Sequence, residues 1–274
     1  MQYDDIKTLY RLGEYKNALS TFSAALPQDE ELCLIYLECL FHCGKIQTAL
    51  QVIRDWKSER GQQSSEPFLV SLEELSFLGQ ACLETGSGKT RIPVDARLLN
   101  QGVIRRAVGL GLLEAARKLA VEADNTYFWC EFIQSLYEEG YTEKAKAGLS
   151  GLDLSLLAGD RPSFRNVAFI FAEILHDEGR FEEAAPIFER LAEGSPEMAR
   201  ARFAACSCYL QTTMNHLLGR VELYRPGEEE QRKIEQYLNN ITEALRIIDS
   251  TNWHTVWSVA QSRNLPASTS GTLQ

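Results

Sequence analysis

The segment Gly86-Ser-Gly-Lys-Thr90 contains the residue types most suggestive of chemistry, because such a sequence ends the loop that binds nucleotide phosphates. That loop also needs a glycine five residues before its second one and a strand before it, so that backbone amides surround the phosphate. The position five residues before Gly88 is occupied by Leu83 rather than glycine. Residues 75–84, where the strand would have to lie, have a helical pattern. We therefore predict an interhelical loop here and disfavour the alternative, nucleotide binding through Gly86–Thr90.

Cysteine and histidine are the next candidates, since Cys33, Cys39, His42 and Cys43 fall within one predicted helix. Tetrahedral zinc needs four ligands that converge on one point. Cys39 and Cys43 share a helix face, but His42 lies to the side, so further ligands would have to come from elsewhere. Buried cysteines acting as small apolar residues are the usual case. We predict no metal site and no cofactor.

Catalytic arrangements are not apparent in the sequence. The four histidines are scattered, no His-Glu-x-x-His motif occurs, and no serine lies in a strand-turn-helix elbow. Paired carboxylates such as Glu182-Glu183 are typical of solvated helix faces. We predict that the protein is not an enzyme.

Charge and cysteine content narrow the class of partner and the compartment. The 274 residues carry 28 basic and 38 acidic side chains, a formal net charge of -10. Binding to nucleic acid or to an anionic membrane needs a clustered basic surface, so we predict no nucleic acid and no membrane among the partners. Seven cysteines, an odd number in a chain of this length, indicate free thiols in a reducing compartment. The polar, acidic first residues do not resemble a secretory signal, and we predict a cytoplasmic protein.

One phrase recurs along the chain: glycine, any residue, a large side chain, two residues, alanine, three residues and an apolar residue. It appears as Gly13-Glu-Tyr15-Lys-Asn-Ala18-Leu-Ser-Thr-Phe22 and again as Gly179-Arg-Phe181-Glu-Glu-Ala184-Ala-Pro-Ile-Phe188. Weaker copies begin at three further glycines, Gly44, Gly111 and Gly140. The interval from Gly44 to Gly111 is close to two periods of about 34 residues, which predicts a degenerate repeat between them.

The phrase has a physical explanation in pairs of helices. Glycine ends one helix and reverses the chain, because a left-handed cap costs least without a Cβ. Alanine lets the second helix approach the first, and the large and apolar residues fill the space toward the next pair. The flanking segments carry apolar residues at three- and four-residue spacing, which is helical. We predict an all-α fold of antiparallel helix pairs.

These residues resemble the tetratricopeptide repeat family. The best copy has Ala168, Phe171, Ala172 and Leu175 at the first-helix packing positions, then Gly179, Phe181, Ala184 and Phe188, with Pro196 closing the unit. The copy before it has Trp129 at the family's tryptophan position, followed by Phe132, Leu136, Gly140 and Ala145. Departures occur at Gln2 and Asp5, which stand at apolar first-helix positions, and at Asn100, where an aromatic belongs. The resemblance implies a right-handed superhelical solenoid of about five to six pairs.

The expected organisation follows from these copies. Residues 1–196 form the repeat array, with the degenerate repeat near 66–95, and residues 197–263 form a C-terminal helical cap. The cap comprises one helix to about Glu222, a stop at Arg225-Pro-Gly227 and a second helix. We also expect Trp253 and Trp257 to dock a short segment back on the cap, and residues 264–274 to be disordered.

The resemblance further implies a concave groove lined by the first helix of each pair. This lining is aromatic and acidic, which suits a peptide with basic and apolar side chains, although Leu34, Phe41 and Phe169 could instead pack between helices. We predict a scaffold that binds a partner protein or peptide, and keep open a regulator that responds to a peptide or small molecule and a homodimer through the last helices. The predicted groove residues are Glu31, Leu34, Glu38, Phe41, Tyr127, Gln134, Tyr137, Glu138, Asn166, Phe169, Glu173, His176 and Asp177.

Overall fold

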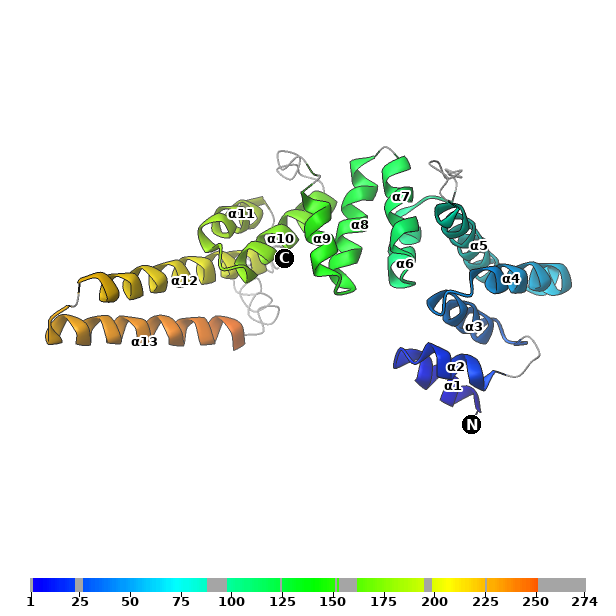
Figure 1. Ribbon diagram of the computed structural model, residues 1–274, viewed down its shortest axis with the longest axis horizontal. Coiled ribbons are helices and arrows are strands. Elements are labelled where there is room, and N and C mark those ends of the chain that lie inside the picture. The colour runs from blue at the N-terminus through cyan, green and yellow to red at the C-terminus, as the bar shows by residue number, and fades with distance from the viewer. Residues whose placement is uncertain are drawn as a thin grey trace, which may run out of the picture. The chain divides into compact units, whose positions relative to one another are not determined.

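A computed structural model describes residues 2–22, 27–87, 98–123, 125–150, 152, 162–194, 199–224 and 226–250. Over these residues the protein consists of α-helices with one short 3₁₀ turn and has no strand, which confirms the all-α prediction (Figure 1). The chain divides into two compact units, residues 1–150 and 151–274, which are described separately below. No helix among the described residues is long and apolar enough to cross a membrane.

The described residues of unit 1 form four helical hairpins and one helix that lies between the second hairpin and the third. The hairpins are α1–α2, α3–α4, α6–α7 and α8–α9, and the partners in each contact one another. The bounds are α1 (Gln2–Arg11), α2 (Tyr15–Thr21), α3 (Glu30–His42), α4 (Ile46–Arg60), η1 (Gly61–Gln63), α5 (Glu66–Gly86), α6 (Gln101–Gly109), α7 (Leu113–Glu122), α8 (Thr126–Glu138) and α9 (Thr142–Leu149).

Five glycines with positive φ turn the chain from the first helix of a hairpin to the second. They are the five glycines of the recurring phrase, with φ between 70° and 79°: Gly13, Gly44, Gly111, Gly140 and Gly179. At Gly140 the glycine N–H donates to the carbonyl of Tyr137 at 3.0 Å, and the N–H of Tyr141 donates to the carbonyl of Leu136 at 2.8 Å. The same two bonds close the other four turns. This is the Schellman arrangement, in which a left-handed residue satisfies the last helical carbonyls.

The alanine of the phrase is fully buried in the second helix of each hairpin. All five copies of this alanine are 0% exposed: Ala18, Ala49, Ala116, Ala145 and Ala184. A larger side chain would hold the second helix away from its neighbours, because protein interiors have few voids that could accept extra atoms. The small residue therefore sets the distance at which successive helices stack.

Helix α5 occupies the place of the predicted degenerate repeat. It is a single helix of 21 residues that contacts α3 and α4 before it and α6 and α7 after it. Gly79 makes the contact with α4 possible, since a Cβ there would lie 2.8 Å from Leu50 Cδ2 and 3.3 Å from the ring of Phe41. Residues 88–97, which include the end of the predicted degenerate repeat and most of the Gly86–Thr90 loop, lie outside the described residues. The segment before that loop is the helix we predicted, because α5 ends at Gly86.

Asn100, which departs from the repeat pattern, has a capping role. Its side-chain oxygen accepts the backbone N–H of Val103 at 3.0 Å at the start of α6. A short polar side chain at this position satisfies one of the free amides of the first turn, which an aromatic residue could not do.

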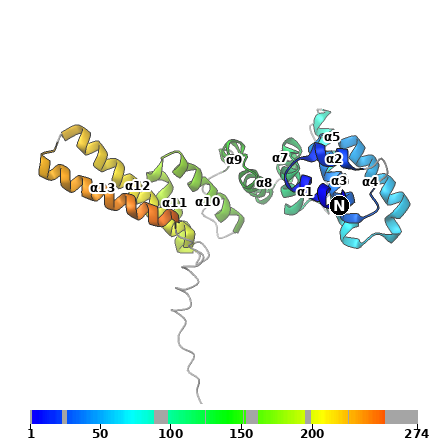
Figure 2. The same cartoon turned by 90° about the horizontal axis from the view of Figure 1, so that it is seen from below.

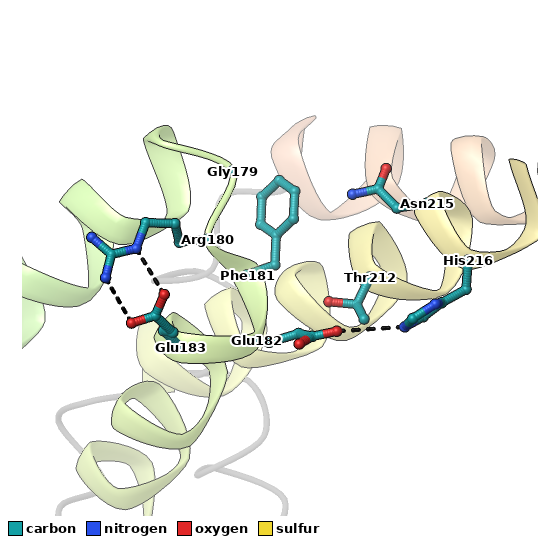
Figure 3. A pocket seen from close by; sticks show the side chains of 8 residues that line it. All are labelled: Gly179, Arg180, Phe181, Glu182, Glu183, Thr212, Asn215 and His216. Carbon is teal, nitrogen blue, oxygen red and sulfur yellow. Dashed lines mark hydrogen bonds and ion pairs between the residues drawn. The ribbon is translucent and has the colours of Figure 1, made fainter. Parts of the chain in front are cut away.

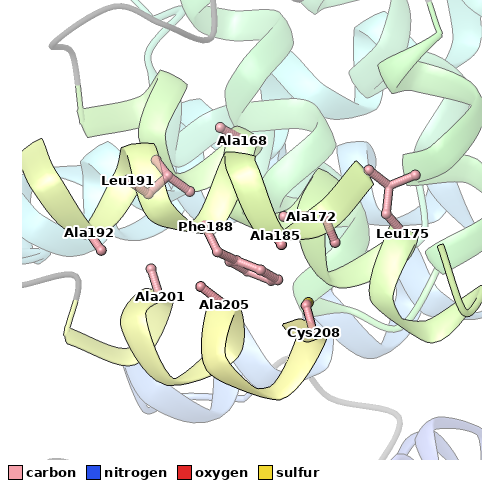
Figure 4. Packing of buried hydrophobic residues seen from close by; sticks show 11 residues of the cluster. Ala168, Ala172, Leu175, Ala185, Phe188, Leu191, Ala192, Ala201, Ala205 and Cys208 are labelled. Atoms are coloured by element: carbon pink, nitrogen blue, oxygen red, sulfur yellow. The ribbon is translucent and has the colours of Figure 1, made fainter. Parts of the chain in front are cut away.

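Unit 2 begins with the fifth hairpin, α10 (Pro162–Asp177) and α11 (Phe181–Gly194), and continues with α12 (Ala199–Tyr224) and α13 (Glu228–Ser250). Figure 4 shows the core at the α10–α11–α12 contact, where Phe188 is 1% exposed. Small residues surround its ring, among them Ala172, Ala201, Ala205 and Cys208. Their size allows three helices to approach one aromatic side chain.

The long hairpin α12–α13 ends the described part of unit 2, and its two helices lie side by side in both views (Figures 1 and 2). Helix α13 packs on α12 with apolar residues at three- and four-residue spacing, of which Leu245 is buried. Its opposite face is polar and exposed, with Arg232, Gln236, Asn239 and Glu243. That this hairpin caps a repeat array stays a prediction. Trp253, Trp257 and the predicted tail 264–274 lie outside the described residues.

Candidate functional site

The predicted groove residues of α3 have different surroundings. Glu31 is exposed and its Oε2 accepts Lys7 Nζ of α1 at 2.7 Å, while Leu34 is half-buried. Phe41 is 2% exposed and lies against the Gly79 position of α5. Phe41 therefore belongs to the core of unit 1, which is the alternative that the sequence left open for it.

Glu38 is fully engaged by neighbouring helices. Its Oε1 accepts Arg106 Nη2 of α6 at 2.8 Å, and its Oε2 accepts the hydroxyl of Tyr10 of α1. Arg106 also donates from Nη1 to Glu74 Oε2 of α5 at 3.1 Å. These three charged side chains are only 18–21% exposed. Burial, together with the carboxylate of Glu38, raises the pKa of Tyr10 well above its ordinary value, so the phenol remains a donor.

The groove residues of α8 are in part used in the same way. Glu138 lies 4.0 Å from Arg105 of α6 and also accepts Gln134 Nε2 at 2.7 Å. Tyr127 and Tyr137 are half-buried. Of these residues, Glu138 contacts a neighbouring first helix through Arg105, whereas its hydrogen bond with Gln134 lies within α8.

Glu131, which the sequence analysis did not single out, is the most buried carboxylate of this face. It is 4% exposed, and its two oxygens accept Gln101 Nε2 at 3.0 Å and Arg105 Nε at 3.1 Å. Burial raises the pKa of Glu131, and the Arg105 guanidinium opposes that rise. Hydrogen bonds thus join α1 to α3, α3 and α5 to α6, and α6 to α8. The sequence signal that could have indicated these bonds is the adjacent pair Arg105 and Arg106, because the first helices around it carry many acidic residues.

A stacked pair lies near the turns of the first two hairpins. The rings of Tyr15 and His42 are parallel, 3.7 Å between centroids. Burial lowers the pKa of His42, and the carboxylates of Glu38 and Glu139 act in the opposite direction. The stack therefore contains a neutral imidazole at neutral pH.

In unit 2 the groove residues lie along α10. Asn166 is exposed, whereas Phe169 is partly buried with its ring 5.4 Å from that of Phe188. Arg200 of α12 covers this ring at 5.3 Å and donates to Glu173 Oε1 at 2.9 Å. The acidic and aromatic character predicted for α10 is present, with an arginine already bound to it.

His176 and Asp177 lie at the end of α10, beside a cavity. His176 contacts the ring of Phe181 edge-on, with 5.1 Å between ring centroids, and its Nδ1 lies 3.6 Å from Asp177 Oδ1. The cavity has a volume of about 220 Å³ and is lined by residues 179–183 together with Thr212, Asn215 and His216 of α12 (Figure 3). This volume lies below the roughly 300–1,000 Å³ of sites that enclose a small molecule or cofactor.

The charged groups of the cavity fall into two sets. Arg180 donates twice to Glu183, at 2.7 and 2.8 Å, and once to Glu178 at 3.2 Å. On the other side of the cavity, Glu182 Oε1 lies 3.4 Å from His216 Nε2, a contact that is an ion pair only when the imidazole is protonated (Figure 3). Hydrogen bonds from Arg180 lower the pKa of Glu183, and Glu183 in turn raises the pKa of Arg180.

The sequence analysis did not find this cavity. It named His176, which contacts the lining residue Phe181, but it named neither Phe181 nor any residue of α12 as a site residue. No local signal could reveal it, since the two lining segments are about 30 residues apart and belong to different helical hairpins.

Cysteines and histidines do not converge anywhere in the described part of the chain. No group of three or more His, Cys, Asp or Glu side chains there could hold a metal ion. Cys33, Cys39, Cys130 and Cys208 are buried, and burial raises their pKa values, to about 12 for Cys39 and about 11 for Cys130. These thiols remain protonated and behave as small apolar residues.

Comparisons with known proteins add no further identification. No family model, no curated protein and no solved structure matches this chain. The helical hairpins are seen directly in the structure, whereas membership of the tetratricopeptide repeat family stays a prediction.

Proposed function

We propose that this protein is a binding scaffold of repeated helical hairpins that holds a partner protein or peptide. The observation that carries the proposal is the cavity between the α10–α11 turn and α12 in unit 2. It is open to solvent at charged side chains, since Glu182 and His216 are each 74% exposed, and its volume suits one side chain of a partner.

The charged side chains of α3, α5 and α6 in unit 1 are better suited to stabilising the scaffold than to binding a partner. Its half-buried charges, Glu38, Glu74 and Arg106, already bond with one another. A partner would have to break these contacts to use the same carboxylates, which would cost the free energy of unpaired, partly buried charges. We therefore propose that the partner contacts unit 2, and that Glu38, Glu74 and Arg106 stabilise unit 1.

The test is a site-specific crosslink in the full-length protein. A photoreactive benzoyl-phenylalanine replaces Asn215, which lines the cavity, or Thr213, an exposed residue of the same helix outside the lining. After irradiation in extract of the source cells, mass spectrometry identifies proteins crosslinked at each position. We expect a defined set at residue 215 that is missing at residue 213.

A second arm blocks the cavity without a crosslinker. Asn215→Trp fills it from an exposed helix position, and we expect co-purification of the crosslinked partner to be lost while the dichroism of the helices stays the same. Equal crosslinking at both positions, together with unchanged co-purification of the Trp variant, would remove the cavity from the proposed function.

A further inference from the structure

The lining of the cavity between the α10–α11 turn and α12 contains more carboxylates than guanidinium groups. Its lining contains two carboxylates, Glu182 and Glu183, against one basic side chain, Arg180. Because Arg180 is bound by Glu183 and by Glu178 outside the lining, one carboxylate is left whose contact in the cavity is His216. The local charge that faces a partner is therefore negative when His216 is neutral.

Neutral groups of the lining add to this preference. Thr212 offers a hydroxyl oxygen and Asn215 an amide oxygen, each able to accept a hydrogen bond. The ring of Phe181 offers a π face, which attracts a cation within about 6 Å of its centroid. Pro186 has no N–H, so the backbone carbonyl of Glu182 lacks the donor four residues later that a helix normally supplies.

The amino end of α11 opposes a cation, because helix dipoles place about half a positive charge there. The two acidic residues in its first turn, Glu182 and Glu183, carry two full negative charges and outweigh that partial charge. An anionic side chain would be repelled by both carboxylates, and Arg180 already donates three hydrogen bonds to Glu183 and Glu178.

We infer that this cavity binds a basic side chain, arginine or lysine, of the partner protein, with its charged end against Glu182 and its alkyl stem along Phe181. The inference rests on the proposed function, since it names the chemistry of the partner at that same cavity. A guanidinium or ammonium group supplies only donors, which the carboxylate of Glu182, the hydroxyl oxygen of Thr212 and the amide oxygen of Asn215 can accept.

The experiment uses defined peptides and the full-length chain labelled with ¹⁵N. Four capped pentapeptides, Ala-Ala-X-Ala-Ala, carry arginine, lysine, citrulline or glutamate at X; citrulline keeps the shape of arginine without its charge. We expect the arginine and lysine peptides to shift the amide signals of Thr212, Asn215 and His216. The citrulline peptide should bind about threefold more weakly than the arginine peptide, as expected for loss of one exposed ion pair.

Matched variants test the residue that carries the inference. Glu182→Gln should weaken binding of the arginine peptide about threefold and leave binding of the citrulline peptide unchanged. The control is Glu193→Gln, an exposed residue of the same helix outside the lining, which should change neither. Asn215→Lys should weaken the arginine peptide by placing a competing ammonium at the cavity, whereas Thr213→Lys adds the same charge to α12 without this effect.

Equal binding of arginine and citrulline, tighter binding of glutamate, or no shift at these three amides with any peptide would overturn the inference. Its failure is distinguishable from failure of the proposed function. If Asn215→Trp loses the partner while Glu182→Gln keeps it and charge has no effect, the cavity binds an uncharged side chain and only the inference is wrong. If Asn215→Trp also retains the partner, both are wrong.

Discussion

Replacing Gly179 or Gly219 by alanine makes the same chemical change at two different kinds of backbone in unit 2. Gly179 has a φ of 75° at the turn between α10 and α11, whereas Gly219 lies in the interior of α12. An added Cβ would meet no atom within 4 Å at either position, so side-chain collisions do not contribute. The difference between the two substitutions therefore measures the backbone alone.

The expected effects have opposite signs. Alanine in the left-handed region costs about 1–2 kcal/mol, and the reduced freedom of the unfolded chain returns about 0.4–1 kcal/mol, which leaves Gly179→Ala destabilising by about 1 kcal/mol. In a helix interior alanine is favoured over glycine by about 1 kcal/mol, so Gly219→Ala should stabilise α12 by that amount. Gly179→Asn should cost less than Gly179→Ala, because asparagine visits the left-handed region more readily.

Hydrogen exchange followed by mass spectrometry on the whole chain is the suitable assay, since it reports each helix separately. A change of about 1 kcal/mol alters the population of the open state about fivefold. We expect peptides from residues 162–194 to exchange about fivefold faster in Gly179→Ala, peptides from α12 to exchange more slowly in Gly219→Ala, and unit 1 to be unchanged. If Gly179→Ala slowed exchange as Gly219→Ala does, the left-handed turn that defines the repeat phrase would be wrong.

Three further substitutions test the packing and charges of unit 1. Gly79→Ala should destabilise by about 1–2 kcal/mol in urea unfolding, because its Cβ would come within 2.8 Å of Leu50 Cδ2 and overpacking outweighs the gain in helix propensity; an unchanged midpoint would contradict this close contact. Arg106→Met should lower the free energy of unfolding by about 2 kcal/mol, because it leaves partly buried carboxylates without their charged donor. In a double-mutant cycle with Glu38→Gln, the two substitutions together should cost less than the sum of their separate effects. Strict additivity would mean that the two side chains do not interact. Because burial lowers the pKa of His42, the unfolded chain binds the proton more tightly than the folded chain. The stability from neutral His42 is therefore present above about pH 6.5 and is lost as the pH falls below it. His42→Phe should flatten the fall in unfolding free energy between pH 7.5 and 5.5, and an identical pH profile would refute the assignment.

Local patterns in the sequence were sufficient to predict the helices and the turns that join them. Among the glycines that the structure describes, those with positive φ are the five of the phrase, and the alanine five positions later is fully buried in each copy, as at Gly140 and Ala145. These features depend on hydrogen bonds and contacts within about ten residues, so neighbouring residue types determine them. The helical pattern of residues 75–84 likewise predicted part of α5, although the neighbours of that helix were not predicted.

Only the tertiary structure decided which side chains are available to a partner. Glu38 looked like a groove carboxylate, but Arg106, 68 residues later, neutralises it, and Phe41 is covered by α5. The cavity of unit 2 forms where α12 passes the α10–α11 turn and brings His216 to Glu182. Such pairings depend on the rotation and crossing angle of each helix on the next, and these are set by the sum of many packed side chains rather than by any one segment of sequence.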